Sequence, residues 1–143
     1  MADRLGVSSS RMLCKAARGV LLQGEEPVIA VVARSDRAGW PDPMVQACRI
    51  PADTDVVLLV TSHRLLVLAT RGRGHVGEPY LGVGPHKLLA LDATVRSPVT
   101  VAVTIQFLDG SLVELTTPVV GAVPGLRSAF ARLLPALDDA PAP

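Results

Sequence analysis

The chain has 143 residues, a formal net charge of +1 at pH 7 and a hydrophobic fraction of 49%. A chain of this length forms one domain that buries roughly 70% of the surface of its unfolded form. The charge is too small for a dedicated nucleic-acid-binding protein, and no apolar run approaches the roughly 18 residues of a membrane-spanning helix.

The cysteines and the first residues bear on the compartment. Cys14 and Cys48 give neither a disulfide framework nor a zinc-ligand spacing. The N-terminus, MADRLGVSSSR, holds an acid and no apolar core, unlike a secretory signal. We therefore expect a cytoplasmic protein with free thiols. Twelve Arg against two Lys is typical of a GC-rich bacterial genome.

The N-terminal segment has the spacing of an amphipathic helix. Ser8-Ser9-Ser10 offers an N-cap and Gly24 an end. The apolar positions are Leu13, Ala17, Val20 and Leu21, and the basic ones are Arg11, Lys15 and Arg18. We expect residues 1–24 to form a tail and a helix packed on the domain. The alternative is a basic helix that binds a membrane surface.

The first strand is expected over Val28–Arg34 and is followed by an irregular stretch, Ser35–Asp55. Prolines in that stretch exclude a central strand, and a short edge strand over Val45–Ile50 stays open. Loops this long are usually functional or disordered. Trp40 indicates docking of this loop on the protein itself or on a partner.

The most apolar part of the chain is Val56–Thr70. Two runs rich in branched side chains, Val56–Val60 and Leu65–Ala69, are separated by Thr61-Ser62-His63-Arg64. Runs of this length and composition favour strands. We therefore expect a tight hairpin that is buried on both faces.

Residues 71–85 contain five glycines and two prolines and are interpreted as a loop. Within it, Gly72–Gly77 matches GxGxxG, and Asp92 follows about 20 residues later. A dinucleotide site also needs a helix N-terminus at the pyrophosphate. Pro79 and Pro85 forbid a useful helix there, so we expect a glycine loop and no cofactor.

The C-terminal part shows alternation and then helical spacing. His86–Arg96 is expected to be a half-buried strand with Leu89, Leu91, Ala93 and Val95 on one face. Val99–Phe107 alternates from Val99 onward, Asp109-Gly110 is a hairpin turn, and Ser111–Thr117 returns. A helix is expected over Pro124–Leu134, with an apolar stripe formed by Leu126, Phe130, Leu133, Leu134 and Leu137.

These elements predict an α+β fold that is mainly β. We expect a strongly bent antiparallel sheet, or partly open barrel, of six or seven strands. The amphipathic C-terminal helix closes it, and the N-terminal helix is an addition. The domain is expected to span residues 25–137, followed by a disordered tail over residues 138–143.

Three short motifs accompany these elements: Leu22–Glu26 (LQGEE), Leu59–Val67 (LVTSHRLLV) and Phe107–Ser111 (FLDGS). With the closing helix, their order over residues 22–137 resembles a pleckstrin-homology-like (PH-like) domain, especially the bacterial and GRAM-type members. The N-terminal helix and the long Ser35–Asp55 segment depart from that pattern. The resemblance implies a binding scaffold without catalysis that engages lipid headgroups, peptides or other subunits.

If the first strands form a meander, two loops emerge at the same end and bring basic side chains to one rim. Guanidinium groups suit phosphate or carboxylate, and in the resemblance these loops take phosphorylated headgroups in eukaryotic members. The interpretation that we favour is a solvated surface, and a binding rim is the alternative. The candidate anion- or partner-binding residues are Arg34, Arg37, Trp40, Arg71 and Arg73, with His75 as a further rim residue.

Catalytic and metal-ligating patterns are weak. His63, His75 and His86 lie on separate segments without ligand spacing. Ser62 and His63 would point apart on a strand, so no triad is expected. We therefore expect a non-catalytic module that binds a protein partner or assembles with itself, through an open strand edge or the Trp40 loop. A membrane-surface adaptor using the arginine rim is the alternative, and a small enzyme is a distant third.

Overall fold

The computed structural model describes residues 10–35, 54–70, 76–108, 110 and 112–134. The elements in chain order are α1 (Ser10–Ala16), η2 (Ala17–Val20), β1 (Pro27–Ser35), β2 (Asp55–Thr61), β3 (Leu65–Thr70), β4 (Val76–Val83), η4 (Pro85–Lys87), β5 (Leu88–Ser97), β6 (Thr100–Phe107), β7 (Leu112–Thr117), η5 (Val120–Ala122) and α2 (Val123–Leu133).

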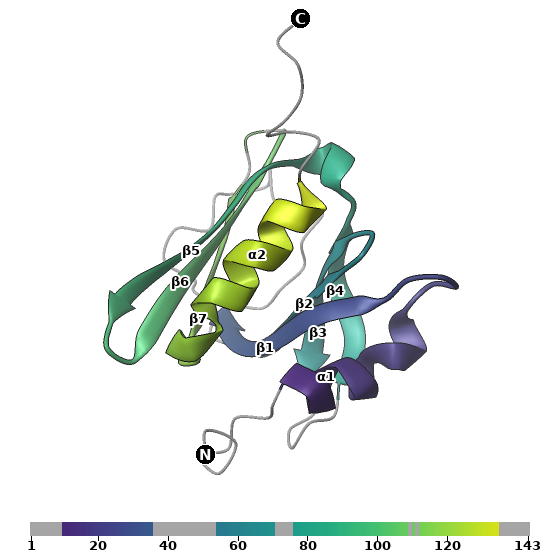
Figure 1. The fold of residues 1–143 in the computed structure, drawn as a ribbon, viewed down its shortest axis with the longest axis horizontal. Coiled ribbons are helices and arrows are strands. Elements are labelled where there is room, and N and C mark those ends of the chain that lie inside the picture. The colour runs from purple at the N-terminus through teal and green to yellow at the C-terminus, as the bar shows by residue number, and fades with distance from the viewer. Residues whose placement is uncertain (1–9, 36–53, 71–75, 109, 111, 135–143) are drawn as a thin grey trace, which may run out of the picture.

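The strands form one antiparallel sheet in the order β4-β3-β2-β1-β7-β6-β5. β1 joins two halves of the sheet: it pairs with β2 along its length, and its end, Arg34 and Ser35, pairs with Thr116 and Leu115 of β7. The sheet is not closed, because β4 and β5 are its two ends. The predicted mainly-β α+β fold with two helices is confirmed, with seven strands (Figure 1).

α2 covers the inner face of the sheet (Figure 1). Its predicted apolar side chains Leu126, Phe130, Leu133 and Leu134 are all buried. The helix lies very close to β1 at Gly125, where an added Cβ would sit 2.9 Å from Cδ1 of Ile29. A side chain at this position would meet the end of the Ile29 side chain, which would have to move to make room for it.

The outer face of β1, β2 and β3 is covered by α1 and η2. Leu13 and Ala17 from the helical segment contact alternate residues of the strands, including Val57, Leu59 and Leu66. The other residues of the same strands, such as Leu58 and Val67, belong to the inner core. The predicted hairpin is therefore confirmed as buried on both faces, because successive side chains of a strand point to opposite sides.

The N-terminal helix is shorter than the sequence predicts. The α-helix ends at Ala16, and one 3₁₀ turn continues to Val20 instead of a helix running to Gly24. Gly19 lowers the helix propensity at this point. Gly24 lies in the following turn with φ +82°. Ser10 accepts a hydrogen bond on its Oγ from the backbone N–H of Ala30 at 2.9 Å, which fixes α1 to β1.

The interpretation of residues 71–85 as a loop is wrong for Val76–Val83, which form β4. β4 is an end strand that pairs only with β3, with two register shifts. Glycines and Pro79 are tolerated because an end strand needs hydrogen bonds on one side only. The residues after the glycine motif therefore form a strand and not a helix. The alternative strand over Val45–Ile50 lies outside the described residues.

The predicted face of β5 is partly wrong. Leu88 is buried, whereas Leu89 is 55% exposed and Val95 is also exposed. The register shifts between Leu88 and Ala90, and again between Val95 and Ser97. Such irregularities turn the neighbouring side chains to the other face.

The two hairpins of the second half follow the predicted pattern, with one exception. Val99 lies in the turn before β6 and is 66% exposed, so it does not share the inner face. The inward residues of β6 and β7 are buried as predicted: Val101, Val103, Ile105, Phe107, Val113, Leu115 and Thr117. Gly110 has φ +92°, which agrees with the predicted turn. Residues 135–143, including Leu137 and the predicted tail, lie outside the described residues.

Candidate functional site

β5 ends the sheet, so one of its edges has no neighbour among the strands that the structure describes. The Nε–H of Arg127 in α2 donates to the carbonyl of Ala93 at 3.0 Å, so the backbone of Ala93 points away from β6. Alternate residues of an antiparallel strand direct their backbone groups to the same side. The N–H and C=O of Leu91 therefore also face the free edge.

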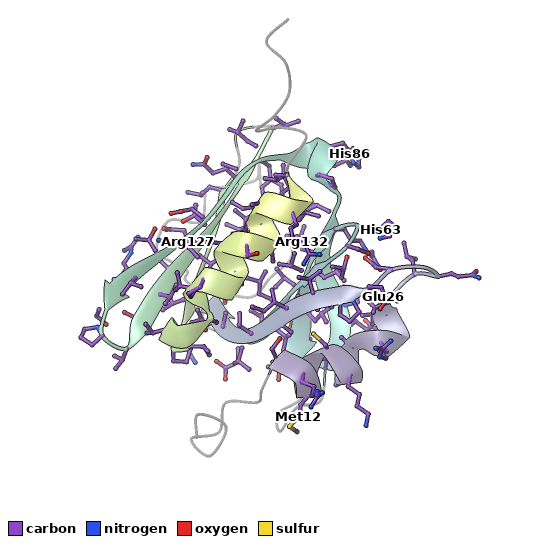
Figure 2. The ribbon with its side chains drawn as sticks, viewed as in Figure 1. Met12, Glu26, His63, His86, Arg127 and Arg132 are labelled. Carbon is purple, nitrogen blue, oxygen red and sulfur yellow. The ribbon has the colours of Figure 1, made fainter. Side chains whose placement is uncertain are left out.

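A groove runs between this edge and α2, with a volume of about 250 Å³. We call it the β5–α2 groove. Arg127 projects from α2 towards β5 and closes one end of the groove by covering Ala93 (Figure 2). Its apolar side chains are Leu89, Leu91, Phe130 and Leu134, and its polar ones include Asp92 and Arg127. Because Leu89 is exposed, the groove offers an apolar surface beside the open backbone edge of β5.

A second polar cluster lies where the central hairpin meets the start of β1. The carboxylate of Glu25 has a side chain only 1% exposed and accepts from Nε of Arg64 at 2.8 Å and from Nη2 of Arg64 at 3.1 Å. The hydroxyl of Thr61 and the backbone N–H of Leu22 also donate to it, at 2.5 Å and 2.9 Å. The buried charge is thus paired and fully hydrogen-bonded.

Burial by itself raises the pKa of Glu25, but the hydrogen bonds from Arg64, Leu22 and Thr61 and the charge of Arg64 outweigh it. The net effect lowers the pKa of Glu25 to about 2. Arg64 also donates to the carbonyl of Val20 at 3.1 Å. One ion pair therefore connects the η2 segment, the short segment before β1 and the turn of the central hairpin.

The prediction that Ser62 and His63 point apart is wrong, because both lie in the turn and not on a strand. Oγ of Ser62 is 2.7 Å from Nδ1 of His63. The same Oγ accepts from the backbone N–H of Glu26 at 3.0 Å, and the N–H of Ser62 donates to the carbonyl of Glu26 at 2.8 Å. These bonds hold the turn against the chain entering β1, near the surface where His63 and Glu26 lie (Figure 2).

Of the predicted rim residues, the structure describes Arg34 alone. It forms an ion pair with Asp55 at 3.2 Å, and both side chains are more than half exposed. In the register of β1, β2 and β3, Arg34 lies opposite Asp55 and Val56 lies opposite Ala69. The end of β1, the start of β2 and the end of β3 therefore lie side by side. The other rim residues, Arg37, Trp40, Arg71, Arg73 and His75, lie outside the described residues, so the rim stays a prediction.

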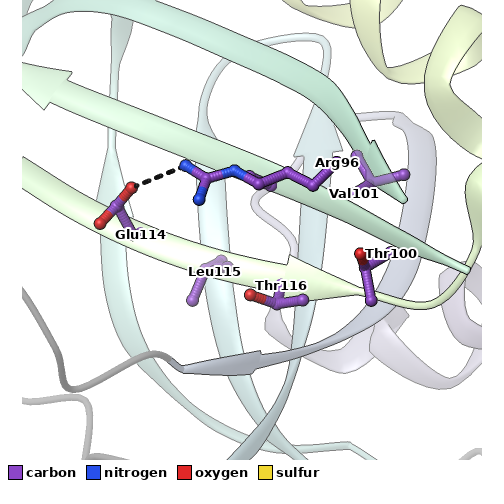
Figure 3. A pocket seen from close by; sticks show the side chains of 7 residues that line it. Arg96, Thr100, Val101, Glu114, Leu115 and Thr116 are labelled. Carbon is purple, nitrogen blue, oxygen red and sulfur yellow. Dashed lines mark ion pairs between the residues drawn. The ribbon is translucent and has the colours of Figure 1, made fainter.

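A smaller hollow lies on the outer face of β5, β6 and β7 (Figure 3). Arg96 reaches across β6 to Glu114, with a distance of 3.7 Å between Nη2 and Oε2. The hydroxyls of Thr100 and Thr116 lie beside this pair. With about 170 Å³, the hollow is smaller than the roughly 300 Å³ at which small-molecule sites begin.

The described side chains give little support for a nucleophilic cysteine or a metal site. Burial raises the pKa of the Cys14 thiol, against the opposing hydrogen bond with Ser10 and the charge of Arg18, so the reactive thiolate is disfavoured. Within the described ranges, no three His, Cys, Asp or Glu side chains gather as a metal site would require. In the same ranges, no helix has the length and apolar character to cross a bilayer.

No family model matches this chain, and no curated protein sequence matches it either. The candidate residues predicted from the sequence do not include the β5–α2 groove. Alternation along β5 predicts an inward-facing Leu89, and β5 contains no proline or glycine that would mark it as an end strand. Only the register shift and the strand order bring Leu89 and the edge at Leu91 to the same groove.

Proposed function

We propose that this chain is a non-catalytic binding module of the PH-like type, and that it binds an extended segment of a partner protein along β5. The observation that carries this proposal is the open edge of β5 at Leu91 beside the apolar β5–α2 groove. The strand order, the C-terminal helix on the inner face and the Glu25–Arg64 pair between two of the short motifs support the PH-like assignment.

The chemistry of the groove defines the segment that fits. A bound strand takes its main-chain hydrogen bonds from Leu91, and its alternate side chains point into the groove, as in other cases of strand addition. Phe130 and Leu134 offer an apolar wall. Because Arg127 already occupies the carbonyl of Ala93, pairing extends from the Leu88 end only as far as Asp92. The expected ligand is a short apolar segment of strand-forming residues.

The test selects peptides from a random displayed library and measures their binding to purified variants by calorimetry. Leu89→Lys places a charge in the groove, and binding is expected to weaken about tenfold or more. Val99→Lys is the matched control, because Val99 is similarly exposed but lies in the turn before β6. Selected peptides should bind this control as they bind the wild type and should shift the amide resonance of Leu91.

Selection of no peptide, or equal binding of selected peptides to Leu89→Lys, would contradict the proposal. Sedimentation at increasing protein concentration addresses the remaining occupant, a second copy of this chain. A dimer that Leu89→Lys abolishes and Val99→Lys preserves would replace the partner segment with self-association through the same edge.

A further inference from the structure

The exposed side of the N-terminal helical segment is basic. Arg11, Lys15 and Arg18 are spaced four and three residues apart, which places them on one side of the helix. Leu13 and Ala17, on the opposite side, are buried against β1, β2 and β3. The three exposed cations, which we call the α1 basic strip, therefore lie on the side of the helical segment that is not packed on the sheet. The helix α1 itself lies at the periphery of the molecule (Figure 1).

The three basic side chains surround a common hollow. It has a volume of about 590 Å³. Cys14 and Pro27 complete its lining. Converging cations around a hollow favour a ligand with negatively charged oxygens, because each guanidinium or ammonium group gains a charge-assisted hydrogen bond there.

Charge is separated along the chain in a way that leaves this strip uncompensated. Residues 4–24 carry four basic residues and no acidic residue, whereas the rest of the chain has a net charge of −3. Among the described residues, the carboxylates that form ion pairs do so with Arg34, Arg64 and Arg96 and not with the strip. The segment that carries the strip is thus the positively charged part of a nearly neutral sequence.

Two exposed apolar side chains lie close to the strip in the sequence. Met12, within α1, is 52% exposed, and Leu22, after η2, is 62% exposed. Basic residues with apolar neighbours on one surface are the combination with which peripheral proteins bind bilayers, since the cations meet phosphate groups while the apolar side chains enter the interface. A free phosphate ion would use the hollow but would leave these apolar side chains in water.

We propose that the α1 basic strip binds a membrane surface that contains anionic phospholipids. A polynucleotide is the less favoured ligand, because its extended charge would also meet the acidic remainder of the chain. The β5–α2 groove and the strip share no lining residue, and β5 lies far from α1 (Figure 1), so the two surfaces can be occupied together. The inference does not depend on the proposed function.

The test is co-sedimentation with vesicles of phosphatidylcholine alone and with vesicles of equal parts phosphatidylcholine and phosphatidylglycerol. The wild type should bind the anionic vesicles only, and less as salt is added. Each cation near an anionic surface contributes about fivefold, so loss of all three should weaken binding on the order of a hundredfold. The variant that removes them carries Arg11→Gln, Lys15→Gln and Arg18→Gln.

A second triple variant separates the strip from the overall charge. It reaches the same net charge of −2 by removing three exposed cations elsewhere on the molecule. It should retain most of the binding of the wild type, and so should Leu89→Lys, which affects only the groove. The substitutions of this control are Lys87→Gln, Arg96→Gln and Arg132→Gln.

Three results would overturn the inference. They are absence of binding to anionic vesicles, equal binding to neutral and anionic vesicles, and equal loss of binding in the two triple variants. Calorimetric binding of inorganic pyrophosphate without binding of vesicles would overturn it as well, because the hollow would then be a site for a small free anion. Circular dichroism of both triple variants confirms that they are folded.

Discussion

Glu25 carries its negative charge at a position that water hardly reaches. Its side chain is 1% exposed, and its pKa of about 2 lies below the ordinary value of 4.5. A carboxylate with a lowered pKa in the folded state stabilises that state above the pKa of the unfolded chain. This contribution is complete above about pH 5 and is lost as the pH falls towards 2.

We therefore predict a specific dependence of stability on acid. The free energy of unfolding of the wild type should fall between pH 5 and pH 2 by about 3 kcal/mol more than that of Glu25→Gln. Urea unfolding at a series of pH values measures the difference. Glu114→Gln is the control, since Glu114 forms only the longer pair with Arg96, and its profile should follow the wild type. Parallel profiles for the wild type and Glu25→Gln would contradict the prediction.

The sequence reveals the two motifs that contain Glu25 and Arg64 but not the ion pair between these residues. Glu25 and Arg64 both lie in segments that resemble known motifs, yet they are 39 residues apart. Nothing in either segment says that its charge is buried. The contact follows from the turn at Ser62, which hydrogen-bonds to Glu26 and thereby brings Arg64 beside Glu25.

Among the elements, α1 has a structural role beyond the strip it exposes. Leu13 and Ala17 cover the outer face of the central strands, where Leu59 and Leu66 would otherwise meet water. We predict that Leu13→Ala lowers the free energy of unfolding by about 2–5 kcal/mol, as for other buried leucines.

Chemical denaturation measures this loss, and binding of a hydrophobic dye reports exposure of the outer face. Lys15→Ala in the same helix is the matched control and should change stability by about 0.5 kcal/mol or less, because its side chain is exposed. A similar stability for both variants would mean that α1 does not hold the outer face closed.

Elements with strong hydrophobic periodicity can be predicted from the sequence, whereas features that depend on neighbouring strands cannot. β6, β7 and α2 have patterns that one buried face explains, the central hairpin has two short continuous apolar runs that are buried on both faces, and all were predicted. β4 was missed because its glycines and Pro79 are acceptable only in a strand with one partner. β5 was predicted as a strand, but its register shift at Leu88 arises from pairing with β6 and leaves no local trace.

The open sheet has two end strands, β4 and β5, which are protected in different ways against pairing with a strand of another chain. β4 carries Glu78 and Pro79, both exposed, and these residues discourage pairing with another strand. β5 carries the exposed charges of Asp92 and Arg96 but no proline, and Arg127 in addition covers the carbonyl of Ala93.

We predict that Arg127→Ala increases self-association, because it frees this carbonyl and lengthens the open edge beyond Asp92. Sedimentation velocity across a range of protein concentrations measures the shift from monomer to dimer or larger species. Arg132→Ala is the control, since Arg132 is an exposed cation of the same helix. If both variants sediment alike, Arg127 does not protect the edge.

The order of the elements also has a consequence for synthesis on the ribosome. α1 emerges first and can cover the outer face of β1, β2 and β3 as soon as they form. Their inner face must wait for α2, which is the last of the described elements and ends 50 residues after the end of β4. At the usual speed of translation, this apolar inner face of the nascent chain stays exposed for roughly 3–10 s. During that interval the growing protein is a natural client for chaperones that shield hydrophobic segments.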